Sequence, residues 1–136
     1  MEYVTLSNGV RMPMLGFGVF QIPDHEEAKR AVRTALDAGY RLVDTAQAYG
    51  NERAVGEAVR ESGIPREEVF ITSKIWLSDF SFEGGQAATE RTLERLGSEY
   101  VDLMLLHQPM GDYIGAWRGL EKMLAAGKVR AIGMAN

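Results

Sequence analysis

The sequence of 136 residues predicts an α/β fold built around a parallel sheet. Short apolar runs, typical of buried strands, alternate with longer stretches in which apolar residues recur at helical spacing. Three of the short runs end in a side chain that can take part in chemistry, namely Asp44, Lys74 and His107. Because parallel neighbours need a crossover helix, we expect a right-handed βαβ series whose strand ends gather these side chains on one face.

The first expected element is a β-hairpin. Residues 3–6 and 10–12 have the pattern of two short strands, and the Asn8-Gly9 pair between them is a strong signal for a tight turn. The hairpin comes before the main series of strands and helices.

The main series alternates between strand and helix. Its expected strands are residues 14–19, 41–44, 69–75, 100–106 and 129–134. Its expected helices are approximately residues 24–38, 51–62, 84–96 and 113–126. Asp24 and Asn51 are the expected N-caps of the first two helices, because their side chains can accept hydrogen bonds from free N–H groups. The pattern leaves two architectures open: a doubly wound sheet, and a (β/α)₈ barrel, which needs about 250 residues.

Composition sets the broad class of protein. With 46% hydrophobic and 25% charged residues, a single globular domain over residues 1–136 is expected. The net charge of -4 and the lack of a Lys/Arg cluster argue against nucleic acid as a partner. The chain has no cysteine, which suits a reducing compartment. No stretch has the length of a membrane span and no signal peptide is evident, so we expect a cytoplasmic protein without a membrane partner.

The segment GYRLVDTAQAYGNE, residues 39–52, resembles the aldo-keto reductases, and further similar segments follow in that family's order. These are LGFGV at 15–19, ITSKIW at 71–76, LERLG at 93–97, YVDL at 100–103, LHQP at 106–109 and GKVRAIG at 127–133. The resemblance implies a (β/α)₈ TIM barrel whose bottom is closed by the hairpin. The chain is then expected to hold the hairpin, five strands and four helices of such a barrel, truncated after the fifth strand.

The same resemblance implies an NADPH-dependent oxidoreductase that converts aldehydes and ketones to alcohols. It is closest to the bacterial branch that reduces diketo-gluconate and small aldehydes. A small carbonyl compound is therefore the expected substrate, and the reaction requires no metal.

Four residues are expected to carry the chemistry. A phenol is a weak acid at neutral pH, so Tyr49 needs a neighbouring cation to stabilise the phenolate that forms when its proton leaves. Lys74 supplies that cation, and Asp44 on the adjacent strand supplies the counter-charge that aims the ammonium. His107, uncharged, can form a hydrogen bond with the substrate oxygen and hold the carbonyl in place.

Cofactor and substrate contacts follow from the resemblance alone. It implies that Gly18, Val19 and Asp44 lie against the cofactor, and that Asn136 holds the nicotinamide carboxamide. Phe20 and Trp76 are the implied apolar walls of a substrate pocket that also contains Tyr49 and His107.

The sequence departs from the family at several positions. Gln108 follows the histidine where many members have a large aromatic residue, and Ala135 replaces a serine before Asn136. The last three strands of the barrel, with the loop that grips the adenosine phosphate, are missing from these 136 residues. A second hypothesis is therefore a catalytically silent half-barrel scaffold that associates with itself through exposed sheet edges, or with a partner.

Overall fold

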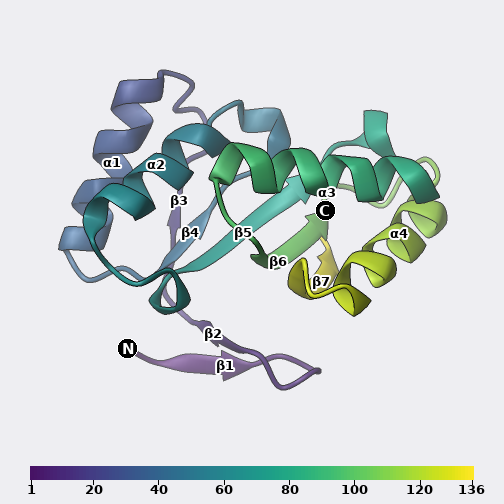
Figure 1. Ribbon diagram of the computed structural model, residues 1–136, viewed down its shortest axis with the longest axis horizontal. Helices are drawn as coiled ribbons and strands as arrows, with labels where there is room; N and C mark the ends of the chain where they lie inside the picture. Colours follow the sequence, from purple (N-terminus) through teal and green to yellow (C-terminus); the bar gives the residue numbers. More distant parts are fainter.

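The computed structural model describes all residues 1–136 and begins with the expected hairpin. Strands β1 (Tyr3–Thr5) and β2 (Arg11–Pro13) pair in antiparallel orientation. The turn is closed by the Gly9 N–H, which donates to the Leu6 carbonyl at 2.9 Å, and Gly9 has a φ of 89°. A side chain is disfavoured at such a φ, which explains the glycine. Figure 1 shows the hairpin lying apart from the helices, below the main sheet.

The main sheet has five parallel strands in the order β3-β4-β5-β6-β7. They are β3 (Phe17–Gly18), β4 (Leu42–Asp44), β5 (Phe70–Ile75), β6 (Val101–Leu106) and β7 (Val129–Met134). The crossovers contain α1 (His25–Asp37), α2 (Glu52–Ser62), α3 (Phe82–Leu96) and α4 (Tyr113–Ala125). Three short 3₁₀ turns, η1 (Gln47–Tyr49), η2 (Arg66–Glu68) and η3 (Leu77–Asp79), complete the elements. The α/β fold with five parallel strands and four helices is confirmed.

The two faces of the sheet are buried differently. A core of 21 residues, including Val43, Ile71 and Met104, lies between the sheet and the helices. On the opposite face, four residues form a smaller apolar layer against the hairpin side chains Leu6, Val10 and Met12; these are Leu42, Phe70, Leu103 and Ala131. The hairpin therefore covers the amino-terminal end of the sheet's second face, as expected for the bottom of a barrel.

Two expected boundaries were wrong. The first sheet strand is limited to Phe17–Gly18, because β3 pairs only with β4, which is itself three residues long. Helix α3 begins at Phe82 rather than near residue 84, since the Ser81 hydroxyl accepts a hydrogen bond from the Gly84 N–H at 2.8 Å and caps the helix there.

Glycines bring α3 and α4 close together. A Cβ built on Gly85 would lie 3.1 Å from the Ala116 carbonyl oxygen, and one on Gly119 would lie 2.6 Å from the Phe82 carbonyl oxygen. The second distance is too short for a side chain, so a larger residue would push the helices apart. None of the helices combines the length and apolar character needed to cross a bilayer.

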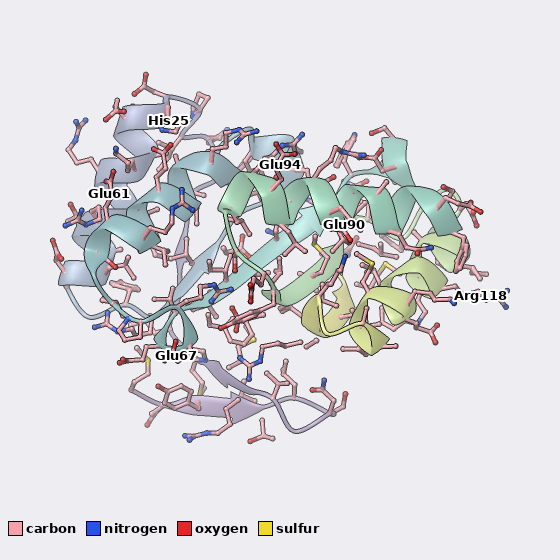
Figure 2. All side chains as sticks on the ribbon, in the orientation of Figure 1. His25, Glu61, Glu67, Glu90, Glu94 and Arg118 are labelled. Atoms are coloured by element: carbon pink, nitrogen blue, oxygen red, sulfur yellow. The ribbon has the colours of Figure 1, made fainter.

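Charged side chains gather on the outer faces of the helices, where Figure 2 shows His25, Glu61, Glu90 and Glu94 pointing away from the sheet. Several join neighbouring helices, as in the pairs His25–Glu57 at 2.7 Å and Lys29–Glu61 at 3.3 Å. Exposed pairs of this kind contribute at most about 1 kcal/mol each, so the cores carry most of the stability.

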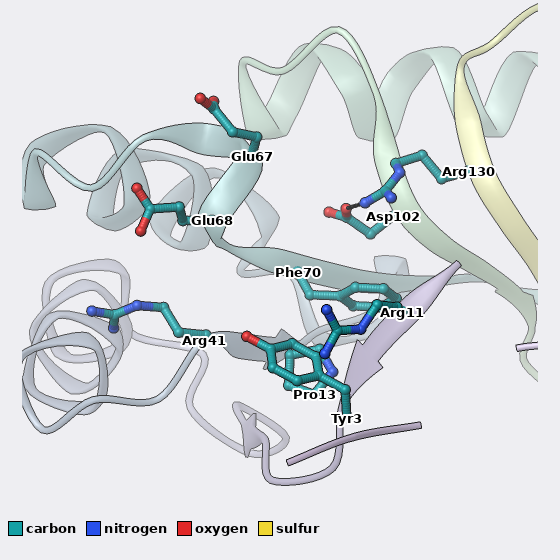
Figure 3. A pocket seen from close by; sticks show the side chains of 9 residues that line it. All are labelled: Tyr3, Arg11, Pro13, Arg41, Glu67, Glu68, Phe70, Asp102 and Arg130. Carbon is teal, nitrogen blue, oxygen red and sulfur yellow. Dashed lines mark hydrogen bonds and ion pairs between the residues drawn. The ribbon is translucent and has the colours of Figure 1, made fainter. Parts of the chain in front are cut away.

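A buried carboxylate organises the end of the sheet that lies opposite the candidate catalytic residues. Asp102, whose side chain is 2% exposed, accepts hydrogen bonds from the Ile71 N–H at 2.9 Å, Arg66 Nη2 at 2.8 Å and Arg130 Nη1 at 2.7 Å. Figure 3 shows Arg130 reaching Asp102 at the edge of a hollow of about 280 Å³, which Arg11, Tyr3 and Phe70 also line.

We expect Asp102→Ala to lower the free energy of unfolding by about 3 kcal/mol, because it strands a buried N–H and removes the partner of two guanidinium groups. Urea denaturation of the two proteins measures this change. Asp37→Ala, an exposed aspartate at the end of α1, is the matched control and should change stability by less than about 0.5 kcal/mol. Equal effects of the two substitutions would show that Asp102 has no special structural role.

Candidate active site

The four expected catalytic residues meet at the carboxyl ends of the parallel strands. Asp44 is the last residue of β4, Lys74 lies one residue before the end of β5, and His107 directly follows β6. Tyr49 is the last residue of η1, which begins three residues after the end of β4, and Gly50 in a left-handed conformation ends the turn. The structure thus brings together side chains that are up to 63 positions apart in the sequence, from Asp44 to His107.

Lys74 is the centre of the cluster. Its residue is 8% exposed, and its ammonium donates to Asp44 Oδ1 at 2.5 Å, to the Thr45 carbonyl at 3.0 Å and to Tyr49 Oη at 3.3 Å. A buried ammonium needs such partners to offset the loss of hydration. The three acceptors use all three of its N–H bonds, so its charge is fixed in position beside the phenol oxygen.

His107 is held as an uncharged imidazole. Burial lowers its pKa below the ordinary 6.5, and the nearby Lys74 ammonium lowers it further, while the Asp44 carboxylate has a smaller opposing effect. The ring is therefore uncharged at neutral pH. Its Nδ1 atom is buried and has no hydrogen-bond partner within the chain.

Aromatic rings line the approach to the cluster. The Phe20 ring lies 5.2 Å from the Tyr49 ring, and the Trp76 ring lies 5.2 Å from the His107 ring at 88°. Tyr49 and His107 are themselves 5.9 Å apart, edge to face. Phe20 is 65% exposed and Trp76 is 36% exposed, so both offer apolar surface to a molecule that contacts the cluster.

The residues expected to contact the cofactor lie around the same strand ends. Gly18 is exposed, and a Cβ built there would meet no atom within 4 Å; Asn136 is exposed beyond the end of β7. The Val19 side chain is fully buried, its N–H donates to the Asp44 carbonyl and its carbonyl accepts from Asn51 Nδ2. Gly18 and Asn136 are therefore accessible from solvent at this edge, whereas the Val19 side chain is not. The contacts of these residues with a cofactor stay a prediction.

The loops at this end of the sheet contain no cationic residue of their own, although Arg91 of α3 reaches Asp79 in one of them at 2.9 Å. The loops at the strand ends, residues 19–24, 45–51, 76–81, 107–112 and 135–136, contain neither lysine nor arginine. A dinucleotide phosphate would therefore find no charge-assisted partner in these loops. The His, Asp and Glu side chains form no group of three or more that could hold a metal ion.

Sequence reasoning missed two buried polar residues behind Tyr49. Asn51 was expected to cap α2, yet its side chain forms no capping bond and is instead 2% exposed among loop carbonyls. Glu52, also 2% exposed, accepts from Ser73 Oγ at 2.6 Å, Thr92 Oγ1 at 2.8 Å and Arg95 Nη1 at 3.1 Å. The only signal in the sequence is the position of the Asn-Glu pair directly after the turn that carries Tyr49.

A phenol, an ammonium and a carboxylate in contact at the carboxyl ends of parallel strands form a cluster that is able to transfer a proton. The profile of the aldo/keto reductase family matches residues 14–136 of this chain. The chain belongs to the aldo/keto reductase family.

Individual relatives agree with this assignment. The chain is 53% identical over 134 residues to the 9,11-endoperoxide prostaglandin H2 reductase of Trypanosoma cruzi, with coverage of 98% of this chain and 47% of that protein. It is 50% identical over 136 residues to the glyoxal reductase of Bacillus subtilis, with coverage of 99% and 49%. The chain thus spans about half the length of the curated relatives it matches.

Solved structures show the same relationship. The aldo/keto reductase from Brucella melitensis matches with a TM-score of 0.96 and 44% identity, covering 99% of this chain and 54% of that one. The Bombyx mori aldo-keto reductase, solved in complex with NADP, matches with a TM-score of 0.93 and 30% identity, covering 98% and 50%. The chain superposes on about half of each barrel, so the hairpin and five strands have the arrangement expected of that fold.

Proposed function

We propose that this site reduces the carbonyl group of aldehydes and small ketones to an alcohol, with NADPH as the electron donor. The observation that carries the proposal is the Lys74 ammonium in contact with both Tyr49 Oη and Asp44 Oδ1. Two similar proteins support it, because one is named a glyoxal reductase and another was solved in complex with NADP.

The residues of this chain perform the proton half of the reaction. When bound, NADPH would supply a hydride to the carbonyl carbon, held by Gly18, Val19, Asp44 and Asn136. Tyr49 donates its phenolic proton to the carbonyl oxygen, on which negative charge builds as the carbon is reduced. The electrons of the Tyr49 O–H bond remain on the phenolate oxygen.

The other members of the cluster support this step. Lys74 stabilises the phenolate through its contact at 3.3 Å, and Asp44 holds the ammonium in that position. His107, uncharged, hydrogen-bonds the substrate oxygen and keeps the carbonyl within reach of the phenol. Phe20 and Trp76 exclude water from one side of the substrate.

The direct test combines cofactor binding with turnover. We expect the 136-residue chain alone to bind NADPH weakly and to show negligible turnover, because its strand-end loops offer no cation to the phosphates. Co-expression with the remaining half of the Bacillus subtilis glyoxal reductase should restore both binding, followed by nicotinamide fluorescence, and reduction of glyoxal.

The same co-expression with a Tyr49→Phe chain is the control, since it should bind NADPH but reduce no carbonyl. Turnover by the paired halves that does not depend on this chain's Tyr49 would contradict the proposed function. Strong NADPH binding by the chain alone would contradict only the expectation of weak binding.

A second candidate function, a scaffold that associates with another copy of itself, rests on the sheet edges. Strands β3 and β7 each pair on one side only. Beside β7 lies a hollow of about 530 Å³ lined mainly by apolar residues, including Leu105, Trp117 and Ile132. Unpaired edges next to apolar surface favour association between chains.

We expect the chain to self-associate through the β7 edge at high micromolar concentration. Light scattering over a concentration series measures the apparent mass, which should rise with concentration. Met134→Lys, at the exposed end of β7, should weaken association because a charge on the edge must be desolvated, whereas Ala87→Lys on the exposed face of α3 should not. A monomer at every concentration would show that the edges do not pair.

A further inference from the structure

The side chain of Asn51 connects three segments of the chain. Its Oδ1 accepts from Thr45 Oγ1 at 2.6 Å, and its Nδ2 donates to the carbonyls of Val19 at 2.9 Å and Ile22 at 3.1 Å. Both N–H bonds of the amide are used, and the group is almost completely buried. A buried polar group with all of its bonds satisfied holds its partners in one arrangement.

Two of these bonds hold the ends of a tight turn. The Ile22 N–H donates to the Val19 carbonyl at 3.3 Å, so residues 19–22 form a four-residue turn with Phe20 and Gln21 at its centre. Gln21 has a φ of 64° and is the only residue other than glycine with a positive φ. Such a conformation is disfavoured by about ten-fold for a residue with a side chain, so surrounding contacts must stabilise it.

The turn carries the ring that covers the phenol of the site. Phe20 is largely exposed, yet its ring lies 5.2 Å from that of Tyr49. With 65% of Phe20 exposed, packing alone holds the ring weakly, and the backbone of the turn sets the position from which it reaches Tyr49. The Asn51 amide is the group that fixes this backbone on both sides of the ring.

The third bond links the turn to the catalytic ammonium. Thr45 donates its hydroxyl to Asn51, while its carbonyl accepts from Lys74 Nζ at 3.0 Å. The same two residues, Thr45 and Asn51, therefore locate both the ammonium beside the phenol and the aromatic ring above it. Capping does not explain this arrangement, because the Asn51 side chain bonds none of the free N–H groups of α2.

We propose that Asn51 is a positioning residue that holds the Phe20 turn over Tyr49 and so determines which carbonyl substituents the site accepts. The effect on substrate choice rests on the proposed function, whereas the position of the Phe20 ring rests only on the geometry of the turn. With the ring held in place, a flat apolar substituent can stack on Phe20 while its carbonyl reaches Tyr49. Without Asn51 the ring loses its fixed position, and this preference is lost.

The first test needs no enzymatic activity. In the 136-residue chain, the nuclear Overhauser effect between the Phe20 and Tyr49 ring protons reports the position of the turn. In Asn51→Ala this signal should fall by about ten-fold. Without the amide, the left-handed conformation of Gln21 is disfavoured by about that factor, so the turn holds the ring over Tyr49 in only a small fraction of the molecules. Gln21→Val leaves Asn51 intact but makes the left-handed conformation still less favourable, so the same signal should fall in a second, independently folding variant.

Rescue separates positioning from general damage. Glycine adopts positive φ readily, so Gln21→Gly added to Asn51→Ala should restore much of the ring-to-ring signal, although it replaces none of the lost hydrogen bonds. Methyl shifts of Val43 and Ile75 in the core serve as the measure of an intact fold. A full signal in Asn51→Ala or in Gln21→Val, or no recovery on adding Gln21→Gly, would overturn the assignment.

The second test applies to the paired halves described above. The ratio of kcat/KM for phenylglyoxal to that for glyoxal should fall in Asn51→Ala, and also in Phe20→Ala. The double variant should show no further decrease, because both changes remove the same contact. If the decreases caused by Asn51→Ala and Phe20→Ala multiplied in the double variant, the inference would be overturned. If the unsubstituted paired halves showed no turnover, the proposed function would be contradicted, and the first test alone would decide the inference.

Discussion

Replacing Tyr49 with phenylalanine is expected to lower the kcat of carbonyl reduction about a thousand-fold, because it removes the proton donor. The ring of the new residue keeps its contacts with Phe20 and His107, at 5.2 and 5.9 Å, so thermal unfolding should remain unchanged. Aldehyde-dependent oxidation of NADPH by the paired halves measures the rate, and circular dichroism measures the unfolding temperature.

Tyr113→Phe is the matched control, since Tyr113 is 40% exposed at the start of α4 and lies outside the cluster. It undergoes the same chemical change and should retain the full rate. If Tyr49→Phe also retained it, the phenol would have no part in the reaction and another acid would have to be sought.

Replacing Lys74 with methionine is expected by itself to lower kcat about a hundred-fold or more, because the phenolate loses the charge that stabilises it. Methionine keeps an unbranched chain of similar length at this buried position. The abandoned partner, Asp44, is 36% exposed, so water can solvate its carboxylate and the fold should persist. Single-turnover rates at saturating NADPH separate this loss from any change in cofactor affinity.

Lys122→Met, on the exposed side of α4, is the control for the loss of one positive charge. Combining Lys74→Met with Tyr49→Phe should slow the reaction little more than Tyr49→Phe alone, because Lys74 acts through the phenol. If the rate losses of the two single variants multiplied in the double variant, Lys74 would have a role in the reaction that is separate from Tyr49.

The sequence predicted the fold because the relevant signals are local. Apolar runs and helical spacing located the five strands of the main sheet and the four α-helices, but not the three 3₁₀ turns. The parallel arrangement followed from the crossover helices. The convergence of Asp44, Lys74 and His107 followed from their places at strand ends, because parallel strands share one carboxyl edge. Tyr49 could be placed beside them since only four residues separate it from the end of β4.

What the sequence could not predict depends on tertiary contacts. Asn51 has a residue type and position typical of a helix cap, and only the folded chain shows that the nearby carbonyls of Val19 and Ile22 compete for its amide. Gly85 and Gly119 lie inside helices, where glycine is needed because another helix approaches closely and not because the backbone turns. Nothing in the local pattern distinguishes these roles.

The order of the strands also bears on how the chain folds during its synthesis. Each strand of the main sheet pairs with the strand that precedes it in the sequence, from β3 through β7. Every crossover helix and strand can therefore dock on structure that has already emerged from the ribosome, with no need to wait for a distant segment. Tyr49, Lys74 and Asp44 would come together before β7 is made, so the cluster proposed to transfer a proton forms before the sheet is complete.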